Sequence, residues 1–315
     1  MSDICAGPGP ASLRVHRAEA RGVELAYFRE GAGGYPLLLL HGWPETKRIW
    51  WRNIVPLAAA GFDVLAPDLR GFGDSALAPG GEYDAVTHAR DVEALAREVL
   101  GHDGCAVCAG DLGGVVAQDL SLRFEGFIER LVLFNTIAPM LPGSPSPLSP
   151  EVRMAGDYFK RQSREADGLA AELDTAAKRR GYVAQMYGPR YWAAPGTFDP
   201  ESVDFMTEPF ADADSFRASI ANYEYYGGPR TAAEPPRLIE RNPTPTLILY
   251  GPEDHVIPRD YPSRMEAAFP ERVGPFTIPG AGHFLQWEAA DVLNQAVRYF
   301  CLDLLRSRPP AQTST

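Results

Sequence analysis

The stretch CAVCAGDLGG, residues 105–114, sets a single charged residue among small neighbours. The apolar run 105–108 predicts a buried strand, and the amphipathic run 115–124 predicts a helix, so Asp111 falls at the turn between them. Such a turn projects its central side chain into the space above the sheet, where only small neighbours fit. The residues around Asp111 meet that requirement: they are Ala109, Gly110, Gly113 and Gly114.

A carboxylate suits this turn electrostatically. The N-terminus of the following helix stabilises negative charge and leaves backbone N–H groups free, so the N–H of Leu112 is placed to receive an oxyanion. Aspartate is also a frequent helix cap, and capping alone is the other interpretation of Asp111. Capping does not require four small residues around the side chain, so we favour a functional aspartate.

Continuous apolar runs predict the fold class. The runs at residues 37–40, 105–109 and 131–134 suit strands covered by helices on both faces, as in a parallel sheet. The strand-helix rhythm stops after residue 135 and resumes at about residue 241. We therefore expect an α/β core, residues 13–135 and 241–305, with a mostly parallel central sheet flanked by helices. Residues 136–240 are expected to form an inserted helical cap, and residues 1–12 and 306–315 flexible tails.

Net charge and cysteine usage limit the partners and the location. The 315 residues carry a formal net charge of −11, which argues against nucleic acid and anionic membrane surfaces as partners. No apolar stretch approaches the roughly 18 residues of a membrane-spanning helix. Four cysteines in a chain of this size favour reduced thiols and a cytoplasmic location. Cys105 and Cys108 form a C-x-x-C inside the predicted strand, which favours packing over redox chemistry.

Two further polar residues follow predicted strands at the same edge of the sheet. Asp254 comes just after the strand 247–250, and His283 lies in a loop after the strand 276–279. The order Asp111, Asp254, His283 is that of nucleophile, acid and histidine in a hydrolase triad. In this interpretation Asp111 attacks carbon and forms an ester, His283 takes a proton from water, and Asp254 stabilises the imidazolium. Glu253 is adjacent and remains the alternative acid.

The run HGWPETKRIWWRNIVPLAAAGFDVLAPDLRGFGDS, residues 41–75, resembles α/β-hydrolase fold enzymes of the epoxide hydrolase and haloalkane dehalogenase branch. The likeness covers nearly all of residues 20–305. It identifies residues 41–44 with the family's H-G-x-P loop, which implies that the N–H of Trp43 is a second oxyanion donor beside Leu112. It implies scaffold roles for His41 and for the turn at residues 68–75.

The electrophile that an aspartate nucleophile suits is a saturated carbon, because water can then hydrolyse the ester at the enzyme's own carbonyl. The leaving group separates the two branches of the family. Haloalkane dehalogenases commonly carry tryptophan after the nucleophile, and fluoroacetate dehalogenases carry arginine there. This chain has Leu112 at that position and Trp43 where those dehalogenases often carry asparagine. The resemblance therefore favours an epoxide, whose oxygen needs a proton donor on leaving.

Tyrosines of the predicted cap are the expected proton donors. The segment FRASIANYE, residues 216–224, resembles the epoxide hydrolase segment that carries a ring-opening tyrosine, which identifies Tyr223. Tyr225 and Tyr226 are the alternatives at this place, and we expect them, with Trp43, to bind substrate. The second family tyrosine aligns near residues 154–155, so Tyr158, one helical turn later, is the nearest candidate.

The sequence thus predicts an epoxide hydrolase that opens a small apolar epoxide to a vicinal diol with water. The alternatives are a haloalkane or haloacid dehalogenase with the same nucleophile, an ester or lactone hydrolase with Asp111 as base, and an inactive ligand-binding homologue. No cofactor or metal is expected, because the histidines are scattered and no G-x-G-x-x-G follows a strand. The sequence leaves open whether the protein forms a homodimer.

Overall fold

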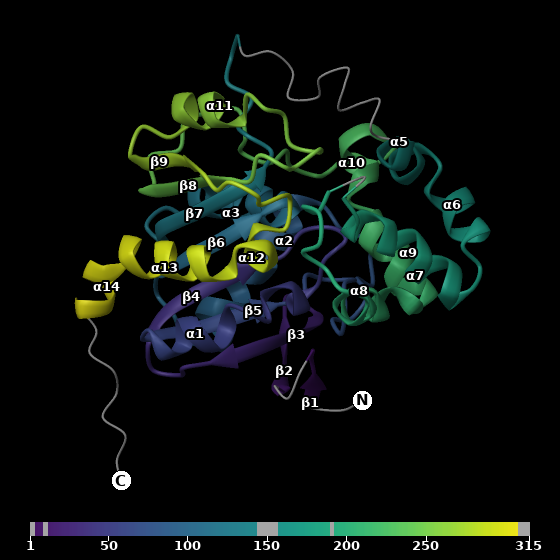
Figure 1. Cartoon of the computed structure of the whole chain (residues 1–315), viewed down its shortest axis with the longest axis horizontal. Helices are drawn as coiled ribbons and strands as arrows, with labels where there is room; N and C mark the ends of the chain where they lie inside the picture. Colours follow the sequence, from purple (N-terminus) through teal and green to yellow (C-terminus); the bar gives the residue numbers. More distant parts are fainter. Residues whose placement is uncertain (1–3, 9–11, 144–156, 190–191, 308–315) are drawn as a thin grey trace.

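The computed structural model describes residues 4–8, 12–143, 157–189 and 192–307, and its centre is one sheet (Figure 1). The described residues form nine strands in the order β1-β2-β3-β5-β4-β6-β7-β8-β9, of which β4 to β9 run parallel and β1 to β3 antiparallel. The strands are β1 (Ile4–Ala6), β2 (Ser12–Ala20), β3 (Val23–Glu30), β4 (Tyr35–Leu40), β5 (Phe62–Pro67), β6 (Cys105–Gly110), β7 (Ile128–Thr136), β8 (Thr246–Tyr250) and β9 (Arg272–Thr277). The mostly parallel α/β sheet expected from the sequence is confirmed.

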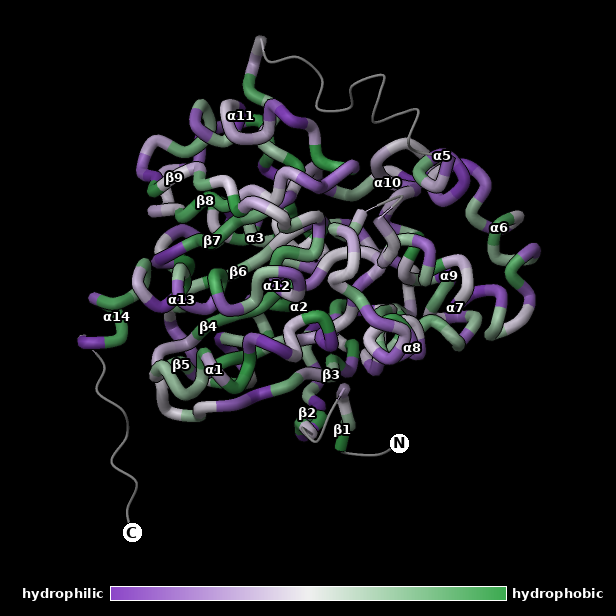
Figure 2. The backbone as a smooth tube through the Cα atoms, viewed as in Figure 1, coloured by the Kyte–Doolittle hydropathy of each residue, from purple (hydrophilic) through white to green (hydrophobic). Residues whose placement is uncertain are grey.

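Helices cover both faces of the sheet. Helices α1 and α13 pack together on one face, and α2 and α3 on the other (Figure 1). Strands β4, β5, β6 and β8 are consequently buried along their whole length, and Figure 2 shows them as the apolar centre of the molecule. The core helices are η1 (Lys47–Trp50), α1 (Ile54–Ala59), α2 (Ala85–Ala94) with a π-helical extension (Leu95–Val99), α3 (Asp111–Arg123), α11 (Tyr261–Ala268), α12 (Leu285–Glu288), α13 (Ala290–Phe300) and α14 (Leu302–Ser307).

A group of helices is inserted between β7 and β8 and lies to one side of the sheet (Figure 1). This is where the sequence predicts a cap, and the segment between Thr136 and Thr246 contains no strand in its described part. Its helices are α5 (Asp157–Arg164), α6 (Ala166–Glu172), α7 (Ala176–Ala184), η3 (Gln185–Tyr187), α8 (Pro200–Thr207), η4 (Glu208–Ala211), α9 (Ala213–Ile220) and α10 (Tyr223–Gly227).

The N-terminal segment departs from the expected flexible tail. Residues Ile4–Ala6 form β1 and pair with β2, with Cys5 opposite Leu13. The Cys5 side chain is buried, and the backbone at Gly7 lies directly against the Trp51 ring. The prediction of a tail over residues 1–12 is therefore wrong for this segment, because tertiary packing against Trp51 orders a strand of only three residues.

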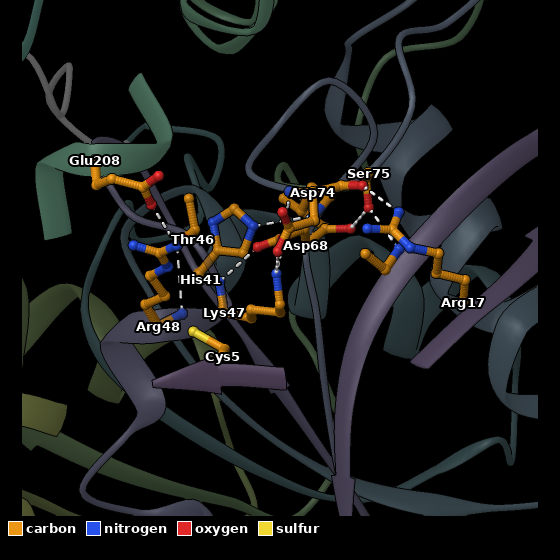
Figure 3. A network of polar contacts seen from close by, with 12 residues as sticks. Cys5, Arg17, His41, Thr46, Lys47, Arg48, Asp68, Asp74, Ser75 and Glu208 are labelled. Carbon is orange, nitrogen blue, oxygen red and sulfur yellow. Dashed lines mark hydrogen bonds and ion pairs between the residues drawn. The ribbon is translucent and has the colours of Figure 1, made fainter. Parts of the chain in front are cut away.

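A buried ion cluster fixes the loop after β4 to the turn after β5 (Figure 3). The ammonium of Lys47, 1% exposed, donates to Asp68 Oδ2 and Asp74 Oδ2, each at 2.5 Å. The backbone N–H of Lys47 donates to Asp68 Oδ1 at 2.7 Å. His41 joins the same two segments, since its Nε2 accepts from the N–H of Leu69 at 3.0 Å. The scaffold roles expected for these two segments thus have a physical basis in buried charge pairing.

Lys47→Met should destabilise the protein strongly, because it leaves the buried carboxylate of Asp68 without its cation. Removing one partner of a buried pair costs about 3–5 kcal/mol of unfolding free energy, to be measured by urea denaturation. Lys178→Met is the matched control, because Lys178 pairs with Asp174 at the exposed surface. The control should leave the urea midpoint unchanged. Equal midpoints for the two variants would contradict the role given to the cluster.

Candidate active site

Asp111 occupies a strained turn between β6 and α3. It is the first residue of α3, and its φ of +43° is in the left-handed region that non-glycine residues rarely adopt. The small neighbours are required by close approaches. A Cβ on Gly113 would lie 2.3 Å from Leu40 O, and one on Gly114 would lie 2.4 Å from Thr136 Oγ1. Helix α3 therefore rests directly on the ends of β4 and β7, which leaves Asp111 at their common edge.

The Asp111 carboxylate is held between a backbone donor and an imidazole. Its Oδ1 accepts from the N–H of Trp43 at 2.8 Å, and its Oδ2 lies 3.4 Å from His283 Nε2. The Asp111 side chain is 17% exposed. Leu112 follows as the second residue of α3, where backbone N–H groups have no intrahelical acceptor. The backbone N–H of Trp43 thus binds the carboxylate, and the role of the Leu112 N–H as a second oxyanion donor stays a prediction.

His283 is placed between two carboxylates. Its Nδ1 lies 2.8 Å from Asp254 Oδ2, and both side chains are almost completely buried. Asp254 Oδ1 accepts from the backbone N–H groups of Val256 and Ile257 at 2.7 and 3.1 Å. The alternative acid Glu253 is exposed. The geometry therefore brings Asp254 to the histidine.

Burial by itself lowers the pKa of His283, but the charge of Asp254 and the hydrogen bonds and charge of Asp111 reverse that effect. Together they raise the pKa of His283 well above its usual value. The imidazolium form is therefore stabilised while both carboxylates are charged.

Asn135 ties together the loops that carry the acid and the histidine. It is the next-to-last residue of β7 and has a φ of +36°, and its amide donates to Gly282 O at 2.7 Å. Its Oδ1 accepts from the N–H of Gly251 at 2.9 Å. The sequence analysis missed this residue, although an asparagine at a predicted strand end is a visible signal. Its contacts fix the relative position of the residues just before Asp254 and His283.

Aromatic rings from the inserted segment gather around Trp43, whose N–H binds Asp111. The Trp43 ring contacts Tyr223 at 5.6 Å between centroids, and Tyr158 contacts both Trp43 and Tyr223, at 6.3 and 6.2 Å. Trp192 packs edge-on against Trp43 at 5.7 Å and against His283 at 4.8 Å. Burial and the negative charge of Asp111 both raise the pKa values of Tyr158 and Tyr223. Both phenols are therefore protonated at neutral pH and able to donate.

The other predicted tyrosines differ in position. Tyr225 packs with a separate apolar cluster that includes Ala78 and Tyr83, and Arg230 lies over its ring. The expectation that Tyr225 binds substrate is therefore not supported. Tyr226 is closer to the site, since burial and then the charge of Asp111 raise its pKa, and its buried hydroxyl has no hydrogen-bond partner among the described residues. Residues 154–155, the other place for the second tyrosine, lie outside the described residues.

Glu45 is a further titratable group that the sequence analysis missed. It is 2% exposed, and its carboxylate accepts from the N–H of Gly42 at 2.6 Å and from the amide of Gln286 at 2.8 Å. Burial raises the pKa of Glu45 to about 7, and the charge of Asp111 adds to the rise. Its position directly after the H-G-x-P loop was visible in the sequence, but its burial was not.

The described residues show no site for a metal ion. They contain no group of three His, Cys, Asp or Glu side chains that could hold a metal ion, and no helix long and apolar enough to cross a membrane. Cys105 and Cys108 are buried free thiols, and burial raises the pKa of each. The arrangement at this edge is a chain of contacts from Asp111 through His283 to Asp254, with the rings of Tyr158 and Tyr223 packed against Trp43 nearby.

Several proteins of known function or structure resemble this chain in sequence and in fold. A family model described as alpha/beta hydrolase fold matches residues 35–290. The soluble epoxide hydrolase of Corynebacterium sp. (strain C12) is 38% identical over 146 residues, 46% of this chain and 49% of that protein, so the match spans about half of the relative's length. The haloalkane dehalogenase of Bradyrhizobium diazoefficiens is 26% identical over 95% of this chain and 98% of its own. The solved epoxide hydrolase CorEH without ligand gives a TM-score of 0.79 at 26% identity, covering 93% of this chain and 99% of that one. The resemblance expected from the sequence is confirmed.

Proposed function

The chain belongs to the α/β hydrolase fold family, and on that premise we propose that it is an epoxide hydrolase acting through a covalent ester on Asp111. One observation carries the proposal: Tyr158 and Tyr223, from two different inserted helices, contact the ring of Trp43, whose backbone N–H binds the carboxylate of Asp111. Phenols are suitable proton donors to an epoxide oxygen. The indole N–H of Trp43 donates to Ser219 Oγ at 3.3 Å, which leaves it unsuited to hold a halide.

The first step forms the ester. A carboxylate oxygen of Asp111 attacks an epoxide carbon, the bond from that carbon to the epoxide oxygen breaks, and a tyrosine donates its proton to that oxygen. The Trp43 N–H holds the carboxylate at Oδ1. Oδ2 faces His283 and is the more weakly held oxygen at 3.4 Å, so we assign it as the attacking atom. Surrounding aromatic rings favour an apolar substrate.

The second step releases the diol. His283 takes a proton from water, and the resulting hydroxide attacks the ester carbonyl carbon of Asp111. The N–H groups of Trp43 and Leu112 stabilise the oxyanion that forms. The bond between that carbon and the ester oxygen, the former Oδ2 of Asp111, then breaks. The diol leaves with this oxygen and with a proton from the imidazolium, which Asp254 has stabilised, and the proton of the new carboxyl group returns to the tyrosinate.

Ester formation itself prepares the histidine for this step. In the free enzyme the charges of Asp254 and Asp111 hold the pKa of His283 high. Esterification removes the charge of Asp111, so that the pKa of His283 falls and the neutral imidazole becomes available as a base. A larger fraction of His283 is therefore neutral, and able to accept a proton from water, once the ester has formed.

His283→Gln should trap the intermediate, because alkylation does not need the histidine but hydrolysis does. Incubated with styrene oxide, the variant should become heavier by one substrate molecule in intact-mass analysis. Digestion should place the adduct on the peptide that contains Asp111. His255→Gln, a change at an exposed histidine, is the matched control and should turn over normally without an adduct.

Two outcomes would count against the proposal. An adduct that forms as fast with phenethyl chloride as with styrene oxide would favour the haloalkane dehalogenase, to which this chain is 26% identical. The absence of any adduct on Asp111 would favour the ester or lactone hydrolase with Asp111 as a base.

Tyr223→Phe and Tyr158→Phe should each slow ester formation by about 10²-fold, the range expected for a lost general acid. Hydrolysis of the preformed ester should hardly change, since no proton reaches the substrate oxygen from tyrosine in that step. Tyr225→Phe is the control, because Tyr225 packs in the separate cluster. Rapid-quench single turnover with styrene oxide separates the two rates. An equal loss in Tyr225→Phe, or none in Tyr223→Phe, would overturn the assignment.

A further inference from the structure

Glu288, at the end of α12, joins the loop that carries His283 to the inserted cap segment. Its Oε2 accepts from the N–H of Gly282 at 2.7 Å and from the N–H of Ala194 at 2.9 Å. Its Oε1 accepts from the N–H of Phe284 at 2.9 Å. One carboxylate thus binds the residues on both sides of His283 and a residue of the cap.

The cap backbone completes the support of the histidine. The N–H of His283 donates to Trp192 O at 2.9 Å, so three successive N–H groups of the loop are satisfied by Glu288 and the cap. The approach is close, because a Cβ on Gly282 would lie 2.6 Å from Ala194 N and 2.7 Å from Trp192 O. The Trp192 ring in turn contacts His283 at 4.8 Å and Tyr158 at 5.3 Å.

Helix capping does not account for these contacts. Phe284 is the N-cap of α12, so its bond to Glu288 is a local capping interaction. Gly282 and Ala194 lie outside that helix, and their two bonds go to the same carboxylate. No ion pair of the described residues includes Glu288. Burial disfavours the charged form of its carboxyl group and raises its pKa. A partly buried carboxylate satisfied by three backbone donors and no cation indicates a positional role.

We propose that Glu288 is a positioning residue that sets the distance between His283 and Asp111 and couples the cap segment at residues 192–194 to the base. This inference rests on the proposed function. His283 Nε2 lies only 3.4 Å from Asp111 Oδ2, so a shift of the loop changes the path of the attacking water. A displacement of about 1 Å is enough for a loss of about 10²-fold in rate. Ester formation uses Asp111 and the tyrosines, so it should be spared.

Glu288→Gln tests this role, because an amide replaces one acceptor oxygen by a donor that faces backbone N–H groups. In single turnover with styrene oxide, ester formation should stay within about twofold of the wild type, and ester hydrolysis should slow by about 10- to 100-fold. Asp291→Asn, an exposed change three residues later, is the control and should leave both rates unaltered. Gly282→Ala keeps the carboxylate but pushes the cap from the loop, and should reproduce the selective loss.

A second measurement separates this inference from the proposed function. The proton on His283 Nδ1, which is hydrogen-bonded to Asp254, gives a downfield signal in proton NMR spectra. This signal should be sharp in the wild type and in Asp291→Asn, and broadened in Glu288→Gln. If the wild type forms no ester with any epoxide, the proposed function fails, while the NMR comparison still decides the positioning role. An unchanged proton signal, unchanged hydrolysis, or equal slowing of both steps in Glu288→Gln would overturn that role.

Discussion

The strained turn at Asp111 is the constraint on which the rest of the site depends. A side chain at φ +43° stands above the sheet only if α3 can approach the ends of β4 and β7, and glycines at positions 113 and 114 permit that approach. The same approach brings the N–H of Trp43 to the carboxylate. The loop after β4 that carries Trp43 is fixed in turn by the buried Lys47 cluster (Figure 3). The close approach of α3 to the sheet therefore both sets the position of the Asp111 carboxylate and gives its negative charge a backbone donor.

Core and cap contribute different parts of the proposed chemistry. The sheet edge supplies the proposed nucleophile, histidine and acid. Backbone N–H groups hold the carboxylates of Asp111 and Asp254, and the Asp254 carboxylate holds the ring of His283. The cap supplies phenols whose raised pKa values keep them protonated. The two parts meet at Glu288, where one carboxylate accepts from both. In the proposed mechanism, ester formation depends on the phenols of the cap, and ester hydrolysis depends on the histidine and the acid of the core. Glu288 affects mainly ester hydrolysis.

Sequence patterns predicted what depends on local spacing. The apolar runs indicated the sheet, and polar residues after strands indicated Asp111, Asp254 and His283, because parallel strands converge at one edge. The sequence patterns could not predict which cap tyrosine faces the site, because neighbouring tyrosines contact different residues. Tyr225 lies in a separate cluster, whereas Tyr223 lies beside Trp43. Strand β1 and the buried state of Glu45 and Glu288 depend on contacts between distant segments. No local pattern encodes such contacts.

The central claim is that water attacks the enzyme's own ester and not the substrate. Single turnover of the wild-type enzyme, in excess over styrene oxide and in water enriched in heavy oxygen, tests it most directly. The account predicts that the label enters the carboxylate of the Asp111 peptide and that the first diol released is unlabelled, since hydroxide adds to the ester carbonyl carbon. Label in the diol, with none in the Asp111 peptide, would show that water attacks the epoxide directly and would contradict the covalent mechanism.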